Sequence, residues 1–152
     1  MKITNYLDRQ HILTALKSTD KRGVLEELTQ VLIDQGRVPA ERRKDVIAGL
    51  VEREELTSTG LGYGLALPHV KTNAVTKIEI VFGRSVPGID FASLDGNPTH
   101  LFFLVLAPPE MTTEYLKVIS IISALMKNAE QRQRLLLAKS PEEVFSFLGS
   151  TK

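Results

Sequence analysis

The chain has 152 residues, 43% of them hydrophobic and 24% charged, and this composition predicts one soluble globular domain over residues 1–152. With 19 Lys and Arg residues against 18 Asp and Glu residues, and no Trp, the sequence disfavours nucleic-acid binding. The absence of Cys excludes disulfides, thiol nucleophiles and thiolate metal sites, and the apolar runs are too short for a membrane-spanning helix.

Two helices are expected in the first third of the chain. Apolar residues at helical spacing predict a helix over residues 21–35, with Thr19 or Asp20 as its N-cap. A second helix is expected to begin at Pro39, because proline suits the first helical position, and to fade near Glu55. Both helices carry an apolar stripe, so each is expected to cover a sheet or another helix.

The central third of the chain predicts strands. Residues 78–82 (IEIVF), apolar except for Glu79, predict a buried strand, and residues 101–107 are an unbroken apolar run of the kind that forms a strand buried on both faces. Between them, residues 88–100 contain Asp-Gly and Asn-Pro pairs, which mark a turn-rich connector. A shorter apolar piece, residues 65–67, follows a polar and glycine-rich loop.

The last third predicts helices. One is expected over residues 113–128 and a shorter one over residues 130–138, and the final helix should start with Ser140 as cap, Pro141 in first position and Glu143 in third. The buried stripe of the first of these is expected at Leu116, Ile119, Ile122 and Met126. Helices, then strands, then helices favour a single layered α/β domain.

The stretch from residue 57 to residue 71 is the part most suggestive of chemistry. Three glycines at alternate positions let the backbone turn tightly and bring N–H groups near an anion. Three residues with hydroxyl side chains come directly before the first glycine. The glycines are Gly60, Gly62 and Gly64, and the hydroxyl residues are Thr57, Ser58 and Thr59. A plain turn is the alternative reading, since neither a Rossmann nor a Walker spacing is present.

His69 follows this loop on a stiff stem, because Pro68 has a fixed φ and restricts the residue before it. A neutral imidazole offers a nitrogen lone pair near pH 7, which is what capture of a phosphoryl group requires. Arg53, at the end of the second helix, is a candidate for a guanidinium contact with phosphoryl oxygens. A lone histidine can also be structural, and that interpretation is expected for His11 and His100.

Several motifs together resemble a known family. Arg53 with the Ser58-Thr59-Gly60 run, the alternate glycines leading to Pro68-His69, and the later PGIDFASLDG segment are similar to the enzyme IIA domain of the fructose, mannitol and nitrogen-regulatory branch of the bacterial phosphotransferase system. This resemblance extends from about Tyr6 to Leu148.

The resemblance implies a mixed β-sheet sandwiched between helices, with His69 phosphorylated at Nε2 and assisted by Arg53. It also implies a histidine phosphocarrier protein as donor, an enzyme IIB domain as acceptor in sugar-uptake members, and no metal or organic cofactor. The chain departs from the family pattern at Tyr115, where members commonly carry a second histidine. A tyrosine there is either a hydrogen-bond donor to the phosphoryl group or a helix-surface aromatic residue.

Three functions therefore remain open. A nitrogen-regulatory phosphocarrier is favoured over a sugar-specific one that delivers to enzyme IIB, because the Tyr115 departure weakens onward transfer. A binding module that responds to phosphorylation without onward transfer is the third. The polar N-terminus lacks the apolar core of a signal peptide, so a cytoplasmic location is expected, and the oligomeric state is left open.

Overall fold

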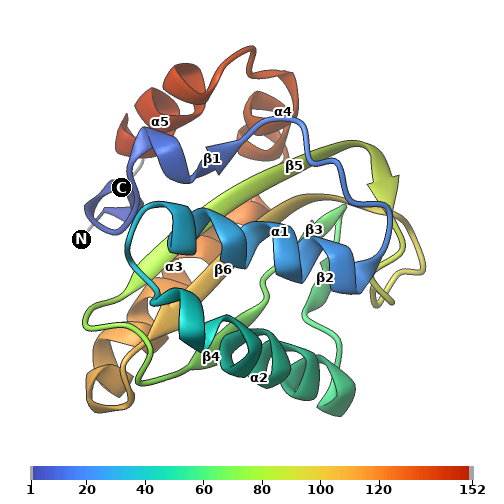
Figure 1. The fold of residues 1–152 in the computed structure, drawn as a ribbon. Helices are drawn as coiled ribbons and strands as arrows, with labels where there is room; N and C mark the ends of the chain where they lie inside the picture. The colour runs from blue at the N-terminus through green and yellow to red at the C-terminus, as the bar shows by residue number, and fades with distance from the viewer. Residues whose placement is uncertain (1, 151–152) are drawn as a thin grey trace.

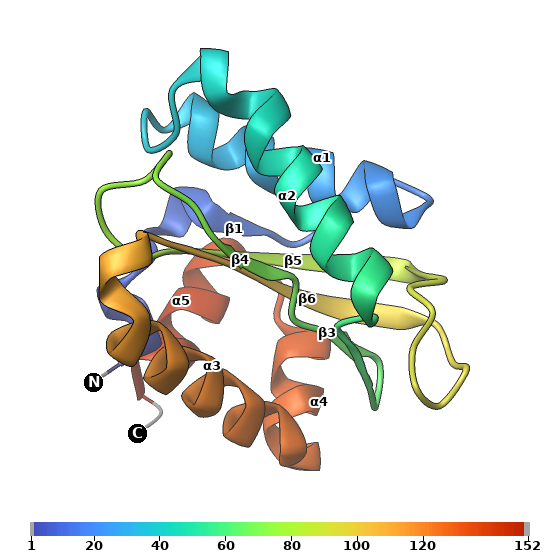
Figure 2. The ribbon, with the colours of Figure 1, turned by 90° about the horizontal axis from the view of Figure 1, so that it is seen from below.

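A computed structural model describes residues 2–150, in which helices cover both faces of a six-stranded mixed sheet. In Figure 2 the sheet is seen edge-on between a layer formed by helices α1 and α2 and a layer formed by α3, α4 and α5. The helices are α1 (Lys21–Asp34), α2 (Arg43–Leu56), α3 (Thr112–Lys127), α4 (Ala129–Leu137) and α5 (Pro141–Ser150), with short 3-10 turns at Ile3–Asn5, Arg9–His11, Ala40–Arg42 and Pro109–Met111. The predicted α/β sandwich is confirmed.

The sheet has the order β1-β5-β6-β3-β2, and β4 also pairs with β6 (Figure 1). Its strands are β1 (Ile12–Leu13), β2 (Gly60–Gly62), β3 (Leu65–Ala66), β4 (His69–Lys71), β5 (Glu79–Ile89) and β6 (Thr99–Ala107). The long central strands β5 and β6 are antiparallel, whereas β3 and β4 both run parallel to β6.

Strand β6 is the centre of the core because helices cover both of its faces. Its residues 101–107 are all buried, as the unbroken apolar run predicted. Successive side chains of β6 point to opposite faces of the sheet. On one face, the side chains that pack with α3, α4 and α5 are Leu101, Phe103 and Val105. On the other face, those that pack with α1 and α2 are Phe102, Leu104 and Leu106.

Strands β3 and β4 form one interrupted strand along the same edge of β6. Leu65 pairs with Leu101 and His69 pairs with Val105 at an unchanged offset, so the chain stays in register through the break. In the gap, the carbonyl of Pro68 accepts a hydrogen bond from the Val105 N–H at 3.0 Å. This arrangement places His69 beside Val105, in the C-terminal half of the buried strand β6.

Two predicted boundaries are wrong. Pro39 is not the first residue of the second helix: it has an extended backbone (φ −59°, ψ 139°) and precedes the Ala40–Arg42 turn, so α2 begins only at Arg43. The strand predicted at residues 78–82 continues to Ile89, because β6 provides a pairing partner for residues that read locally as a connector. The very short strands β1, β2 and β4 escaped prediction.

The buried face of α3 also differs from the prediction. Leu116 was expected in the core but is 57% exposed, whereas Tyr115 is only 6% exposed. The residues that pack against the sheet are Tyr115, Val118, Ile122, Leu125 and Met126. The interpretation of Tyr115 as a helix-surface aromatic residue is therefore wrong.

The final helix begins as the sequence predicts. Ser140 Oγ accepts a hydrogen bond from the Glu143 N–H at 3.1 Å. The Glu143 carboxylate accepts a hydrogen bond from the N–H of Lys139, one residue before the cap. Both side chains of the capping motif, Ser140 and Glu143, therefore bond to backbone N–H groups. Among residues 2–150, none of the helices has the length and apolar character needed to traverse a bilayer.

His11 is structural, as expected, and is buried beside strand β5. Its Nδ1 lies 3.2 Å from the carbonyl oxygen of Ile80, and Nε2 is buried without a hydrogen-bond partner. Burial lowers the pKa of His11, and this effect exceeds the opposing effects of the Ile80 carbonyl and Asp8.

We predict that the protein becomes less stable as the pH falls through the ordinary histidine range. Below about pH 6.5 the unfolded chain takes up a proton at residue 11 that the folded protein resists, so the free energy of unfolding falls by at most about 1.4 kcal/mol per pH unit for this group. Urea unfolding of the wild type and of His11→Gln at several pH values measures this. The variant should show a shallower decline, and equal slopes would contradict the assignment.

Candidate functional site

The backbone around His69 is anchored on both sides. The N–H of Leu67 donates to the carbonyl of Thr59 at 3.0 Å, and the Pro68 carbonyl accepts from Val105. Pro68 has no N–H to donate, and it lies with Leu67 in the break between β3 and β4. His69 therefore projects from a fixed point at the edge of β6.

The hydrogen bond of His69 Nδ1 determines which ring nitrogen is available for chemistry. Nδ1 lies 2.6 Å from the carbonyl oxygen of Leu67. A carbonyl oxygen only accepts, so Nδ1 carries the hydrogen, and in the neutral ring Nε2 carries the lone pair. The structure thus provides the tautomer needed for attack by Nε2.

The surroundings of His69 favour its neutral form. Burial lowers the pKa of His69 below its ordinary value, and this is the largest effect. The Leu67 carbonyl raises it, the positive charge of Arg53 lowers it and the negative charge of Glu54 raises it. The net direction is downward, so the imidazole is unprotonated and nucleophilic near pH 7.

Tyr115 faces His69 from the first turn of α3. The two ring centroids are 6.0 Å apart and the rings are tilted by 52°. Burial raises the pKa of Tyr115 to about 12, although the charge of Arg53 acts in the opposite direction. The side chain beside the imidazole is therefore a neutral phenol near pH 7.

Arg53 completes this group from the C-terminal end of α2. Its Nη1 donates to the carbonyl of Thr57 at 2.9 Å, which uses one of its five N–H bonds. The ion pairs formed within residues 2–150 do not include Arg53. Its charge acts on both His69 and Tyr115, so α2, β4 and α3 bring a cation, a nucleophile and a phenol together.

The alternate glycines form the turn of a hairpin between β2 and β3. Gly62 and Gly64 have φ of +90° and +77°, and Tyr63 between them has φ of +57°. The N–H of Tyr63 is not presented to a ligand, because it donates to the Asp95 carboxylate at 3.0 Å. Gly60 is required for a different reason: a Cβ there would lie 2.9 Å from the backbone of Ser93. The glycines at these positions therefore fit the alternative of a plain turn better than that of an anion-binding loop.

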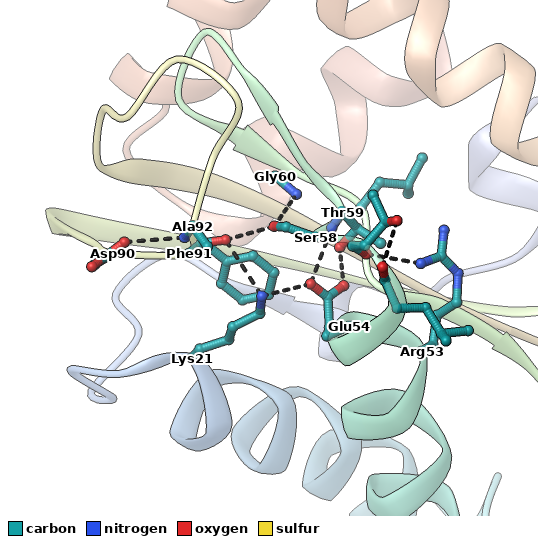
Figure 3. Close-up of polar contacts among 12 residues, drawn as sticks. Lys21, Arg53, Glu54, Ser58, Thr59, Gly60, Asp90, Phe91 and Ala92 are labelled. Carbon is teal, nitrogen blue, oxygen red and sulfur yellow. Dashed lines mark hydrogen bonds and ion pairs between the residues drawn. The ribbon is translucent and has the colours of Figure 1, made fainter.

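The hydroxyl groups before the hairpin also donate within the protein (Figure 3). Ser58 donates to the carbonyl of Phe91 at 2.7 Å, Thr57 donates to the carbonyl of Leu56, and Thr59 donates to the Glu54 carboxylate. In this structure they hold the loop against its neighbours, and their hydrogens are not directed at the space around His69.

Two other polar residues do not belong to this group. Lys71, two residues after His69, is exposed and donates to Thr112 Oγ1 at 3.2 Å at the start of α3. His100 is structural: its Nδ1 lies 3.0 Å from the Ser85 carbonyl, and its ring packs beside Gly88. Residues 2–150 contain no cluster of three or more His, Cys, Asp or Glu side chains arranged to hold a metal ion.

Sequence reasoning missed Glu54 and Lys21. Glu54 is 7% exposed and forms an ion pair with Lys21 at 2.9 Å. The sequence did indicate that Glu54 is buried, because it lies four residues after Leu50 and so continues the buried stripe of α2. A carboxylate at such a position needs a partner in the folded protein.

A comparison with known families assigns the chain to one of them. A family model described as "Phosphoenolpyruvate-dependent sugar phosphotransferase system, EIIA 2" matches residues 5–150, nearly the whole chain. The chain belongs to this family. EIIA 2 proteins are components of a phosphotransferase, so the resemblance predicted from the motifs is confirmed.

Similar proteins come from both branches of the family. The chain is 36% identical over 149 residues to the fructose-specific EIIABC component of Bacillus subtilis, covering 98% of this chain but only 23% of that protein. It is 33% identical over 149 residues to a nitrogen regulatory protein of Bradyrhizobium diazoefficiens, covering 98% and 95% of the two chains. The crystal structure of nitrogen regulatory protein IIA-Ntr from Neisseria meningitidis matches with a TM-score of 0.88 at 32% identity, covering 96% and 98%.

We predict that the imidazole of His69 titrates below the ordinary histidine range and that Arg53→Ala raises its pKa. The positive charge of Arg53 disfavours a second positive charge on the ring, so removing it makes protonation easier. A pH titration of the His69 ring by NMR measures both effects. Lys44→Met, which removes an exposed positive charge from the same helix, is the matched control and should leave the titration unchanged. An equal pKa in wild type and Arg53→Ala would contradict the proximity of the two groups.

Proposed function

We propose that this protein is a phosphocarrier of the nitrogen-regulatory type, which accepts a phosphoryl group on His69 Nε2 from a histidine phosphocarrier protein. The observation that carries the proposal is the Nδ1–H bond to the Leu67 carbonyl, which leaves the Nε2 lone pair available in a ring that burial keeps neutral. Family membership supports the reaction class, and a cytoplasmic site of action follows from the nature of the donor.

In the proposed step, the Nε2 lone pair attacks phosphorus and forms a new P–N bond. The P–N bond to the donor imidazole breaks, and its electron pair stays on the donor ring. Positive charge then develops on the His69 ring, where Nδ1–H is already bonded to the Leu67 carbonyl. That hydrogen bond becomes charge-assisted, so it stabilises the product more than the starting ring.

Arg53 and Tyr115 are proposed to act on the transferred oxygens. Phosphoryl transfer depends chiefly on positioning and on stabilisation of oxygen charge, which a guanidinium supplies with several directed N–H bonds. Tyr115 contributes one O–H donor without a charge, because its pKa is about 12. Ser58, Thr59 and the hairpin glycines support the loop in this proposal and do not contact the phosphoryl group.

The regulatory role is favoured over sugar transport by the residue beside His69. A neutral phenol does not supply the positive charge that a second histidine can carry, so departure of the phosphoryl group toward an acceptor is expected to be slow. The alternative is a sugar-specific EIIA that delivers to an enzyme IIB, and the name of the fructose-specific relative supports it. A module that is read in its phosphorylated state without onward transfer is the third possibility.

The central test is phosphorylation by a phosphorylated histidine carrier protein, followed by intact mass analysis. We predict one added phosphoryl group on the wild type, labile in acid and stable in alkali as a phosphoramidate is, and none on His69→Ala. Labelling of His69→Ala to the wild-type extent would show that the reactive residue is elsewhere.

The same assay tests Arg53 through its rate. Loss of an oriented charge-assisted contact is expected to slow phosphorylation of Arg53→Ala by about two to three decades. Arg53→Lys should recover only part of the rate, because an ammonium does not reproduce the guanidinium fork. Unchanged rates in both variants would remove Arg53 from the reaction.

A further prediction concerns Tyr115 and the choice between the two branches. Phosphorylated wild type should transfer slowly to an enzyme IIB in single-turnover experiments, and Tyr115→His should speed that delivery more than it speeds loading from the donor. The reason is the charge that an imidazolium brings to the departing oxygens and a phenol does not.

Tyr115→Phe is the matched control for this test because it removes only the hydroxyl group. It should slow loading if the hydroxyl donates to a phosphoryl oxygen and leave the packing of α3 intact. Rapid delivery to a sugar-specific IIB by the unmodified protein would instead establish the transport role.

A further inference from the structure

Glu54 is a buried carboxylate with a complete set of partners. Its Oε1 forms an ion pair with Lys21 Nζ at 2.9 Å and accepts the Thr59 N–H at 3.0 Å, while Oε2 accepts the Thr59 hydroxyl. Lys21 is the first residue of α1, and Glu54 lies in the last turn of α2. The carboxylate therefore ties both helices of one layer to the segment that leads into the hairpin.

Lys21 extends this network to the loop between β5 and β6. Its Nζ lies 4.6 Å from the ring centroid of Phe91 and 3.5 Å from the Phe91 carbonyl oxygen. That carbonyl also accepts from Ser58 Oγ, which in turn accepts the Gly60 N–H at 3.0 Å (Figure 3). One lysine thus holds the ends of two helices and two loops around Glu54.

The arrangement matters for Arg53 because Arg53 and Glu54 are neighbours in sequence. Successive helical residues point about 100° apart, and Figure 3 shows the two side chains leaving α2 in different directions. A buried carboxylate that loses its cation is strongly unfavourable and attracts another. The guanidinium of Arg53 is the cation next to it in the chain, and it is also the one whose charge acts on His69.

We propose that Lys21 and Glu54 are positioning residues for the phosphoryl-transfer site. Their ion pair neutralises the buried carboxylate and holds Thr59, and it thereby keeps Arg53 directed at His69 and away from Glu54. The proposal rests on the proposed function for its kinetic consequence, whereas its electrostatic consequence can be measured without any phosphoryl donor.

The electrostatic test compares His69 titrations by NMR in Lys21→Met and Glu54→Gln. In Lys21→Met, Arg53 turns toward the unpaired carboxylate, so the pKa of His69 should rise, and by more than the same substitution raises it in an Arg53→Ala background, where only the uncovered Glu54 charge acts. In Glu54→Gln, the amide oxygen can still accept from the Thr59 N–H, but a negative charge that acts on His69 is removed, so the pKa of His69 should fall. Lys44→Met is the control for loss of an exposed lysine and should leave the pKa unchanged.

The kinetic test is the rate of single-turnover phosphorylation from the carrier protein. Lys21→Met should slow it by about tenfold, because the Arg53 contact is partly withdrawn from the reaction. Lys21→Arg keeps the cation and should retain the wild-type rate. The double variant Lys21→Met/Glu54→Gln should be faster than Lys21→Met, because the carboxylate that attracts Arg53 is gone.

A purely structural role for the pair gives different results. The rates would then follow thermal stability, the double variant would be the slowest, and the shift of the His69 pKa caused by Lys21→Met would be the same with and without Arg53. Any of these results overturns the proposal. If Lys21→Met does not fold, the double variant Lys21→Met/Glu54→Gln decides the question: with no buried carboxylate to attract Arg53 it should keep nearly the wild-type rate, and a large loss of rate in the folded double variant overturns the proposal.

Failure of the proposed function has its own signature. If the wild type accepts no phosphoryl group on His69, that function is wrong, while a Lys21→Met shift of the His69 pKa that depends on Arg53 still establishes the positioning of Arg53. If the wild type is phosphorylated and Lys21→Met keeps both its rate and its His69 pKa, only the positioning proposal is wrong.

Discussion

The site depends on one interruption in the pairing along strand β6. Strands β3 and β4 follow β6 in a single register, and Leu67 and Pro68 form the break between them. At the break the Leu67 carbonyl is available to the His69 ring, while the Pro68 carbonyl still bonds to Val105. In an uninterrupted strand the Leu67 carbonyl would bond to the backbone of a neighbouring strand. The hydrogen bond that fixes the tautomer of His69 would then be absent.

The same break also sets the electrostatic environment of the imidazole. Because β6 is buried on both faces, a ring held against it is partly withdrawn from water, and its protonated form is disfavoured. Arg53 strengthens that effect, so one cation keeps the imidazole neutral and, in the proposed reaction, also binds the oxygens of the incoming phosphoryl group. Glu54 opposes it, and its pairing with Lys21 limits how far it does so.

Short sequence patterns predicted those parts of the site that are determined by residues adjacent in the sequence. Pro68 before His69 and Arg53 near a helix end were visible from the sequence, and both lie where those patterns place them. Tyr115 was noticed only through the family resemblance, and its burial depends on which of two adjacent apolar faces of α3 meets the sheet. The partnership of Lys21 with Glu54 joins separate helices, so no local spacing could reveal it.

The residue beside His69 decides how much charge the phosphorylated site has to bear. A phosphoryl group carries between one and two negative charges near pH 7, and Arg53 brings one positive charge to it. Tyr115 adds a donor but no charge, and Lys71 is exposed and bonded to Thr112. In the proposed reaction the His69 ring also gains positive charge, which offsets part of the phosphoryl charge, so phosphorylation would make the surface around His69 more negative than in the free protein. A change of that kind can be read by a partner with a basic surface, which is why a neutral phenol at this position suits a protein that reports its phosphorylation state.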